Sequence, residues 1–178
     1  MKALALGADK AVHLRTEERQ VDPGSIAGTI AEELKGHEFD VLLFGKKGVD
    51  DDNQQLGQMV GELLAIPCVT QIVKLDLSNG KATAHREVEG GALVVETTLP
   101  AAFTAEKDLT VPRYASLREL VAAKKKPIAV KDVKLKPPLL EIVSIQNPPA
   151  RPPGKVVGKG VEAVPVLVKL LHEEAKVI

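Results

Sequence analysis

The sequence predicts an α/β fold in which a parallel sheet is followed by an antiparallel meander and an extended C-terminal arm. Short apolar runs at 11–14 and 41–44 are each followed by a helical pattern, which is typical of strands and helices that alternate around a parallel sheet. Between residues 69 and 99 the apolar pattern alternates and is interrupted by turn residues, as in a meander. After residue 128 the chain is rich in proline and has only short apolar runs. We expect this part to lie extended over another surface, because it cannot build a core of its own.

The helices of the parallel part have recognisable ends and apolar faces. The first is expected to begin after the N-cap Asp22, with Pro23 in its first turn, and to end at Gly36. Its apolar residues recur at intervals of four: Ile26, Ile30 and Leu34. The second helix follows the strand 41–44, and its inner face is predicted to consist of Leu56, Met59, Val60, Leu63 and Leu64.

The meander is predicted to contain three strands joined by glycine-containing turns: 69–77, 81–88 and 92–99. Residues 105–112 show no periodicity and are interpreted as a loop. Two further helices are expected at 116–125 and 164–176.

The first residues suggest that the sequence begins inside a domain. Residues 2–7 have the pattern of a helix end capped by glycine. A sheet of this kind usually has about five strands, whereas only two parallel strands are evident before the meander. We therefore expect an N-terminally shortened chain that lacks the first strands and helices of its domain.

Composition and charge exclude several classes of protein. Lys and Arg number 24 and Asp and Glu also 24, so the bulk charge favours neither nucleic acid nor an anionic membrane as partner. One Tyr, three Phe and no Trp provide little surface for stacking single-stranded nucleic acid. No run of about 18 apolar residues predicts membrane insertion, and the single cysteine, Cys68, fits a reducing compartment. We expect a soluble intracellular protein.

The segment most informative about chemistry lies between the second strand and the second helix. In open parallel sheets nucleotides bind at the carboxyl ends of strands, where helix N-termini present N–H groups to anions. Gly45 and Gly48 permit close backbone approach, and Gln54 and Gln55 can donate amide hydrogens to phosphate. The aspartates at 50–52 repel phosphate, so we expect them to point away from it, bond to ribose or backbone, or share a cation. From these residues alone, a phosphate site and a plain acidic helix cap both stay open.

The letters GKKGVDDDNQQLGQM at 45–59 resemble the signature of electron transfer flavoprotein β subunits, which is close to GKQxxDDDxNQTGQM. Further segments resemble family motifs in the same order. REVEGG at 86–91 is similar to REVDGG, the segment 104–117 is similar to TADLRLNEPRYxSL, and AKKKPI at 123–128 is similar to KAKKKPI. GADKAVHL at 7–14 also fits the family's GADRAIHV. The resemblance covers essentially the whole of this chain. The first strands and helices of the family have no counterpart in it. It implies a Rossmann-like fold of the adenine-nucleotide-hydrolase type.

The resemblance implies an electron carrier, not an enzyme, with no catalytic residues of its own. It implies a heterodimer in which an α subunit holds most of the redox FAD, while the β subunit holds one AMP as a structural nucleotide. By motif position, the AMP contacts fall on Gly45, Lys46, Lys47, Gly48, Val49, Asp50, Asp51, Asp52, Asn53, Gln54, Gln55 and Leu56. Gln54 and Leu56 stand where the family usually has Asn and Thr, so one phosphate-binding hydroxyl is lost at Leu56.

The partners implied by the resemblance are acyl-CoA dehydrogenases, as in fatty acid oxidation, and a quinone oxidoreductase. Leu117, three residues after Tyr114, takes the position of the family's exposed docking leucine. Without the family, Leu117 is interpreted as a core residue of a short helix. Lys124 and Lys125 either steer an acidic partner or form a solvated edge. Arg86 either faces the partner's flavin or ribose or pairs with a neighbouring glutamate.

Three parts are predicted from the resemblance: a nucleotide-binding α/β domain at 1–104, a partner recognition loop at 105–127, and an arm at 128–178 that packs on the α subunit. The expected compartment is the cytoplasm of a bacterium or the mitochondrial matrix of a eukaryote.

Several alternatives stay open. An electron-bifurcating member of the family holds a second FAD in place of AMP, although DDDNQQLGQM is closer to the AMP class than DGDTAQ. A stand-alone adenine-nucleotide-binding module needs no partner. An enzyme on the related hydrolase fold would need an SGGxDS-like loop, which the sequence lacks. The four histidines are scattered without ligand spacing, so no metal site is predicted: His13, His37, His85 and His172.

Overall fold

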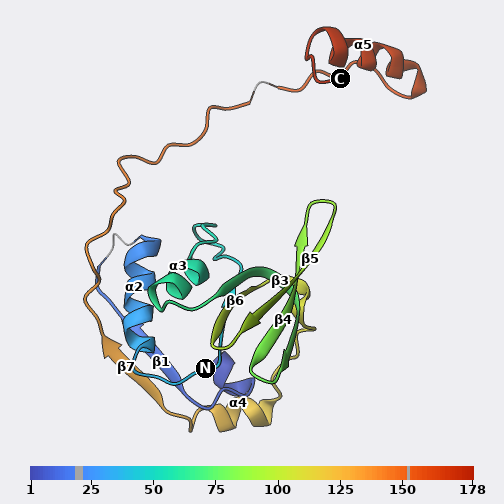
Figure 1. The fold of residues 1–178 in the computed structure, drawn as a ribbon. Coiled ribbons are helices and arrows are strands. Elements are labelled where there is room, and N and C mark those ends of the chain that lie inside the picture. The colour runs from blue at the N-terminus through green and yellow to red at the C-terminus, as the bar shows by residue number, and fades with distance from the viewer. Residues whose placement is uncertain (19–21, 152) are drawn as a thin grey trace. The chain divides into compact units, whose positions relative to one another are not determined.

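The computed structural model describes residues 1–18, 22–151 and 153–178. The chain divides into two compact units, Met1–Glu141 and Ile142–Ile178. Figure 1 shows the elements of both units. Each unit is described by itself.

Five strands of the first unit form one sheet, in the order β2-β6-β3-β4-β5 (Figure 1). β2 (Val41–Gly45) and β3 (Cys68–Ser78) each pair in parallel with β6 (Ala101–Ala105). β4 (Lys81–Val88) and β5 (Gly91–Thr98) continue the sheet in antiparallel pairing from β3. The predicted fold class, a parallel sheet followed by an antiparallel meander, is confirmed.

β6 is the strand that the sequence pattern did not reveal. Its residues AAFTA follow Pro100 directly, and alanine is depleted in strands, so the sequence pattern assigns 101–104 to no element between the strand 92–99 and the loop 105–112. The structure buries Ala101, Ala102, Phe103 and Thr104 almost completely. β6 is therefore the central parallel strand, and the short 3₁₀ helix η1 (Lys107–Leu109) follows it within the predicted loop.

The two predicted parallel strands do not pair with each other. β1 (Ala11–Arg15) instead pairs in parallel with β7 (Ile128–Asp132) in a separate two-stranded sheet. At one end of this pair, the Arg15 guanidinium donates to the Asp132 carboxylate, with nitrogen–oxygen distances of 2.5 and 2.9 Å. The first residues of the predicted arm thus form a strand of the first unit.

α2 (Pro23–Leu34) begins as predicted from its sequence. The Asp22 carboxylate accepts the Ser25 backbone N–H at 2.7 Å, and the Ser25 hydroxyl accepts the Asp22 N–H at 3.1 Å, a reciprocal capping box. Asp22 also accepts the Leu139 backbone N–H at 2.7 Å. The N–H donors of Ser25 and then Leu139 hold the pKa of Asp22 below its ordinary value. One buried carboxylate therefore fixes both the start of α2 and the chain beyond β7.

The buried faces of the two helices agree with the predicted faces only in part, at the fully buried Val60. α2 packs against α3 (Leu56–Leu63), and the two lie side by side in Figure 1. The buried residues are mostly small: Ser25, Ala27, Gly28 and Ala31 in α2, and Gly57, Val60 and Gly61 in α3. The predicted Ile26, Ile30 and Leu34 are half-buried, and Leu63 is exposed. The two glycines of α3 face the sheet, since a Cβ at Gly57 would meet Thr104 and one at Gly61 would meet Cys68. The small residues thus let α3 lie close to the sheet.

Two clusters of apolar side chains form the core of the first unit. The larger one lies on the five-stranded sheet and comprises Val69, Ile72, Ala82, Ala84, Ala101 and Phe103. The smaller one joins α1 (Lys2–Ala5) to α4 (Leu117–Ala123) through Leu4, Ala5 and Ala123. The amino-terminal helix end predicted at 2–7 is confirmed, with Gly7 at a φ of 122° after α1.

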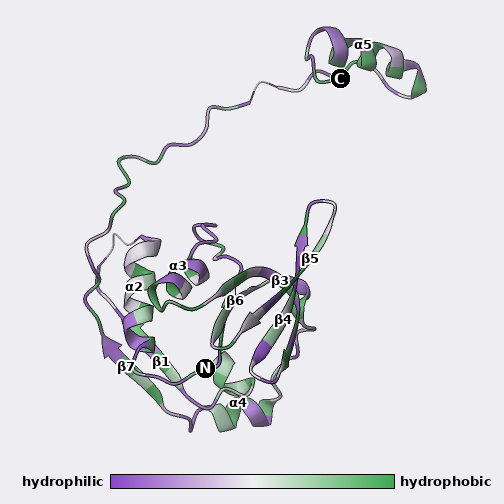
Figure 2. Ribbon diagram, in the orientation of Figure 1, coloured by the Kyte–Doolittle hydropathy of each residue, from purple (hydrophilic) through white to green (hydrophobic). Residues whose placement is uncertain are grey.

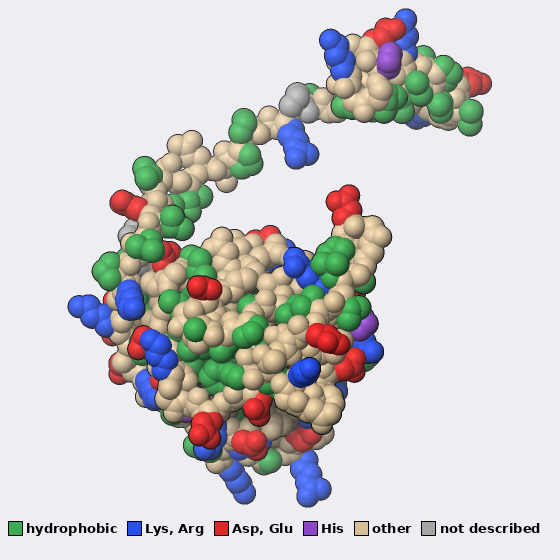
Figure 3. Space-filling view, viewed as in Figure 1, with side chains coloured by type: hydrophobic (Ala, Val, Ile, Leu, Met, Phe, Trp, Pro, Cys, Tyr) green, Lys and Arg blue, Asp and Glu red, His purple; other side chains and the backbone are tan. Residues whose placement is uncertain are grey.

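The second unit contains the 3₁₀ helix η2 (Val161–Ala163) and α5 (Val164–Glu173). None of its described residues is buried: in α5, Val164, Val166, Leu167 and Val168 are exposed, and Leu170 and Leu171 are half-buried. Green and purple stretches alternate along α5 in Figure 2, and green side chains cover parts of this unit in Figure 3. This unit therefore lacks a core of its own. Within the described ranges, no helix is both long and apolar enough to cross a membrane.

Gly57 should be needed for the contact between α3 and the sheet. A Cβ at this position would lie 2.5 Å from Thr104 Cγ2 and 3.3 Å from the Phe44 ring. We expect Gly57→Ala to lower the free energy of unfolding by about 1–3 kcal/mol, because overpacking forces a backbone shift. Urea denaturation followed by far-UV circular dichroism measures the change.

Gly36→Ala is the matched control, because a Cβ there would meet no atom within 4 Å. Its effect should stay within about 0.5 kcal/mol. Equal effects of the two substitutions would contradict the close contact at Gly57.

Candidate nucleotide site

The candidate site lies where β2 ends and α3 begins. A cavity of about 320 Å³ opens there, a volume within the range of roughly 300–1,000 Å³ usual for small-molecule sites. Its walls come from the first turn of α2, the end of β2 and the loop that leads into α3. The lining residues are Pro23, Ile26, Phe44, Gly45, Lys46, Lys47, Gly48, Asp50, Asp51, Asn53, Gln54, Gln55 and Leu56.

Of the twelve residues expected to contact a nucleotide, only Val49 and Asp52 do not line the cavity. Val49 is fully exposed. The sequence reasoning missed Pro23, Ile26 and Phe44. A signal for the first two existed, because a helix that connects parallel strands starts at the carboxyl edge of the sheet, where the loop also lies.

The charged side chains of the loop are largely paired within the protein. Lys46 Nζ lies 2.6 Å from Glu106 Oε2, and this contact lowers the pKa of Glu106. Lys47 pairs with Asp52, and Asp51 accepts a hydrogen bond of 2.8 Å from Asn53 Nδ2. Neither lysine is therefore an uncompensated positive charge. An anion in this cavity would depend on uncharged N–H donors.

Such donors are present where α3 starts. Its N-cap residue, Gln55, makes no side-chain capping hydrogen bond, although the first N–H groups of a helix lack partners within the helix. The cavity wall here consists of Gln54, Gln55 and Leu56. Backbone N–H groups and two side-chain amides can thus converge on one anionic group without adding charge.

The loop backbone is strained at two residues that are not glycine. Asp52 and Gln54 have φ angles of 58° and 55°, in the left-handed region that ordinary residues adopt at a cost in free energy. Strain of this kind collects at ligand clamps, where the surrounding structure maintains it. Gln58 Nε2 donates to the Gln54 carbonyl at 2.7 Å and supports this conformation from α3.

The predicted docking residues form a separate surface on and beside α4. Leu117 is 78% exposed and Tyr114 is 93% exposed, so Leu117 is not a core residue. Lys124 and Lys125 are exposed at the other end of α4, whereas Lys126 donates to the carbonyls of Leu4 and Ala8.

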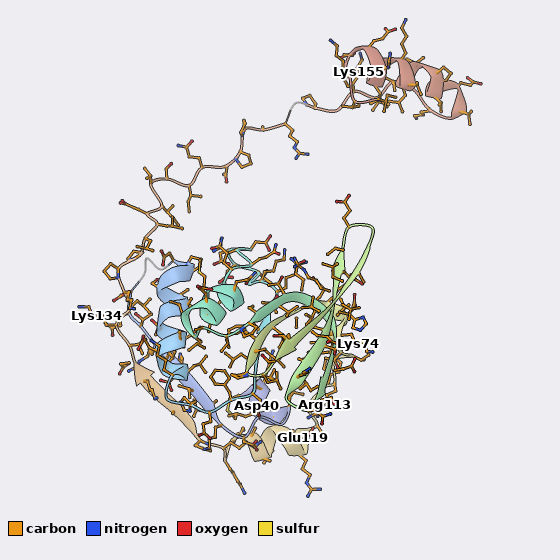
Figure 4. All side chains as sticks on the ribbon, in the orientation of Figure 1. Asp40, Lys74, Arg113, Glu119, Lys134 and Lys155 are labelled. Carbon is orange, nitrogen blue, oxygen red and sulfur yellow. The ribbon has the colours of Figure 1, made fainter. Side chains whose placement is uncertain are left out.

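The start of α4 is fixed by ionic and capping contacts. Ser116 and Glu119 form a reciprocal capping box, and Arg113 donates to Glu119 Oε1 at 3.1 Å and to the Leu6 carbonyl at 2.6 Å. Figure 4 shows Arg113 and Glu119 together beside α4. These bonds hold Leu117, the first residue of the helix, in an outward position.

The fold and the cavity at the carboxyl edge of its parallel strands define an α/β protein of the Rossmann-like class. The model of the electron transfer flavoprotein domain matches residues 1–136. The chain belongs to the electron transfer flavoprotein family. Its similar relatives are β subunits, and its role is in electron transfer.

Three of these relatives are each named electron transfer flavoprotein subunit beta. The protein of Bacillus subtilis is 38% identical, over 99% of this chain and 72% of its own length. The protein of Sus scrofa is 36% identical, over 98% of this chain and 70% of its own length. The mitochondrial protein of Arabidopsis thaliana is 39% identical with the same coverage.

The contacts of Glu119 predict a pH dependence of stability. The backbone N–H of Ser116, the Ser116 hydroxyl and then Arg113 lower the pKa of Glu119 from 4.5 to about 2. Because the folded pKa is lower than the unfolded one, ionised Glu119 stabilises the fold above about pH 4.5. This contribution is lost as the pH falls toward about 2. We expect Glu119→Gln to reduce stability near neutral pH and to have a smaller effect at about pH 3, measured by urea unfolding.

Glu38→Gln serves as the control, because no ion pair of Glu38 occurs among the described residues. A pH-independent effect of Glu119→Gln would show that the charge of Glu119 does not stabilise α4.

Proposed function

We propose that this chain is the β subunit of a heterodimeric electron transfer flavoprotein and that it holds one AMP between β2 and α3. The observation that carries the proposal is the cavity itself. It combines glycine backbone, two glutamine side chains and an uncapped helix start with lysines that are already paired to carboxylates. This donor set suits a phosphate bound through N–H groups, and the site would serve as structural support.

The two sides of the cavity suit the two ends of an adenylate. Pro23, Ile26 and Phe44 offer apolar surface of the kind that packs on a purine ring. The helix start and the glutamine amides offer donors to the phosphate. Asp50 and Asp51 line the cavity and can accept hydrogen bonds from ribose hydroxyls. AMP therefore fits the chemistry of the lining residues.

The redox chemistry would be supplied by FAD, most of it held by the α subunit. The role of this chain is then to present a surface on which other proteins exchange electrons. For acyl-CoA dehydrogenases that surface is proposed to be the region of Leu117, Tyr114, Lys124 and Lys125. Burial of one exposed leucine contributes about 1.5–3 kcal/mol, which suits a small, transient contact. A quinone oxidoreductase would accept the electrons.

The proposed division of the chain is a nucleotide-binding domain at 1–104, a recognition loop at 105–127 and an arm at 128–178. The arm is proposed to pack on the α subunit. Its apolar side chains are exposed along the stretch that follows β7. Those between residues 139 and 145 are Leu139, Leu140, Ile142, Val143 and Ile145. A partner surface would remove this apolar area from water. The proposed compartment is the bacterial cytoplasm or the mitochondrial matrix.

Leu56→Thr should strengthen AMP binding. Leu56 lines the cavity at the first position of α3, and a hydroxyl there can donate to phosphate. One added hydrogen bond is worth about 0.5–1.5 kcal/mol, so we expect the dissociation constant for AMP to fall by about two- to tenfold. Isothermal titration calorimetry measures it.

Leu56→Val is the matched control, since valine has the shape of threonine without the hydroxyl. It should leave AMP affinity at or below that of the unsubstituted chain. If the unsubstituted chain and both variants bind no AMP, the adenylate site is refuted. Preferential binding of FAD at one per chain would favour the bifurcating type.

Leu117→Ala should weaken docking of a dehydrogenase. The heterodimer formed by co-expression with an α subunit should be yellow, and its flavin spectrum should not change on substitution. We expect the rate of flavin reduction by an acyl-CoA dehydrogenase at limiting concentration to fall by about tenfold or more, because one apolar anchor is lost.

Leu77→Ala is the control, because Leu77 is an exposed leucine on β3, outside the proposed docking surface. Unaltered electron transfer in Leu117→Ala would exclude the docking role of this leucine. A colourless, stable monomer would argue against the heterodimer.

A further inference from the structure

Two glutamines with left-handed backbones are hydrogen-bonded to each other across the first unit. Gln54, in the loop before α3, has a φ of 55°, and Gln71, within β3, has a φ of 56°. Gln71 Nε2 donates to Gln54 Oε1 at 3.3 Å. Both backbones are in a conformation that glutamine seldom adopts. The pair therefore joins two strained segments that are seventeen residues apart in sequence.

Gln71 marks an irregularity in β3. The pairing of β3 with β6 changes register between Val69 and Ile72, and its pairing with β4 changes register between Ile72 and Lys74. The backbone N–H of Gln71 does not join the regular ladder and donates instead to Thr104 Oγ1 at 2.8 Å. Thr104 is buried in β6. Two hydrogen bonds thus stabilise the irregular conformation of Gln71, one to Thr104 of the central strand and one to the Gln54 side chain.

The irregularity lies directly beside the β4–β5 hairpin. Ile72 is paired with Arg86 of β4, and the Ile72 carbonyl accepts the Glu106 N–H at 3.0 Å. Glu106 in turn pairs with Lys46 of the loop. The loop before α3 is therefore linked to the turn end of the hairpin by two routes, one through Gln54 and Gln71 and one through Lys46 and Glu106.

A second cavity lies at this junction. Its volume is about 480 Å³, and its walls include Lys46, Gln71, Arg86 and Glu106. Lys46 also lines the nucleotide cavity. The Nε atom of Arg86 is buried and finds no hydrogen-bond partner in the part of the chain that the structure describes. The position of Arg86 is therefore sensitive to the course of β3 beside it.

We propose that Gln71 is a positioning residue that couples the loop before α3 to the turn end of the β4–β5 hairpin, so that an adenylate held by the loop also orders Arg86 and the second cavity. The second half of this inference rests on the proposed adenylate site. An adenylate on the loop would fix Gln54 in its left-handed conformation and so preserve its bond to Gln71. The irregular turn of β3, and Arg86 with it, would then sample fewer conformations.

The coupling is tested first in the 178-residue chain without nucleotide, with Gln54→Asn and Gln71→Asn. Asparagine tolerates the left-handed backbone better than glutamine but is one methylene shorter, so either variant breaks the side-chain bond and spares the fold. We expect amide hydrogen exchange at residues 84–95 to become about two- to tenfold faster, the range for loss of one intramolecular hydrogen bond.

Glu62→Gln is the matched control, because Glu62 is an exposed residue of α3 that has no part in the bond between Gln54 and Gln71. It should leave exchange at 84–95 unchanged. Exchange that is unchanged in both asparagine variants, or accelerated equally by Glu62→Gln, would overturn the coupling.

In the second part of the experiment, AMP is added to each chain. In the unsubstituted chain AMP should slow exchange both at 45–58 and at 84–95. In Gln71→Asn it should slow exchange at 45–58 only, which a merely structural role of Gln71 would not produce. Slowing at 84–95 of equal size in both chains would refute the positioning role. If AMP has no effect at 45–58 in any chain, the adenylate proposal fails. The experiment without nucleotide then decides by itself whether Gln71 couples the loop to the hairpin.

Discussion

The parallel part of the structure depends on β6, which is hydrogen-bonded on both sides, to β2 and to β3. Its side chains are buried on both faces, and Thr104 contributes to two contacts that position the site. The methyl group of Thr104 sets how closely α3 can approach, which is why position 57 is glycine. Its hydroxyl accepts the N–H of Gln71 and so maintains the irregularity in β3. The helix start and the neighbouring strand are thus both placed by one threonine.

The chemistry of the loop follows from this placement and from its internal charge pairing. Lysines that bound a phosphate directly would attract it strongly, but their ion pairs with Glu106 and Asp52 would first have to break. Since those pairs are already formed, the loop offers directional N–H donors instead. This arrangement agrees with a ligand that supports the fold and is not turned over, whereas a catalytic phosphate site needs groups that respond to charge developing in a transition state.

Much of this organisation could be predicted from the sequence, and the failures have physical causes. The N-cap at Asp22 and the loop signature at 45–59 depend on local chemistry, which a sequence displays directly. β6 was missed because AAFTA has neither β-branched residues in alternation nor a clear boundary. The inner faces of α2 and α3 were predicted from their large residues, but most of their buried residues are small, and at Gly61 the helix α3 lies so close to Cys68 and Ala102 of the sheet that a side chain has little room. The bond between Gln54 and Gln71 depends on two unusual φ angles, for which no local pattern exists.

The prolines between β7 and η2 have a consequence for association. No helix or strand is formed by the described residues of this stretch, and the pairs Pro137-Pro138 and Pro148-Pro149 restrict the backbone there. A segment that is already restricted before it meets a surface loses less conformational entropy when it becomes ordered. A long contact can then form at a modest cost, so the prolines would favour a stable subunit interface even though the segment brings no folded core to it.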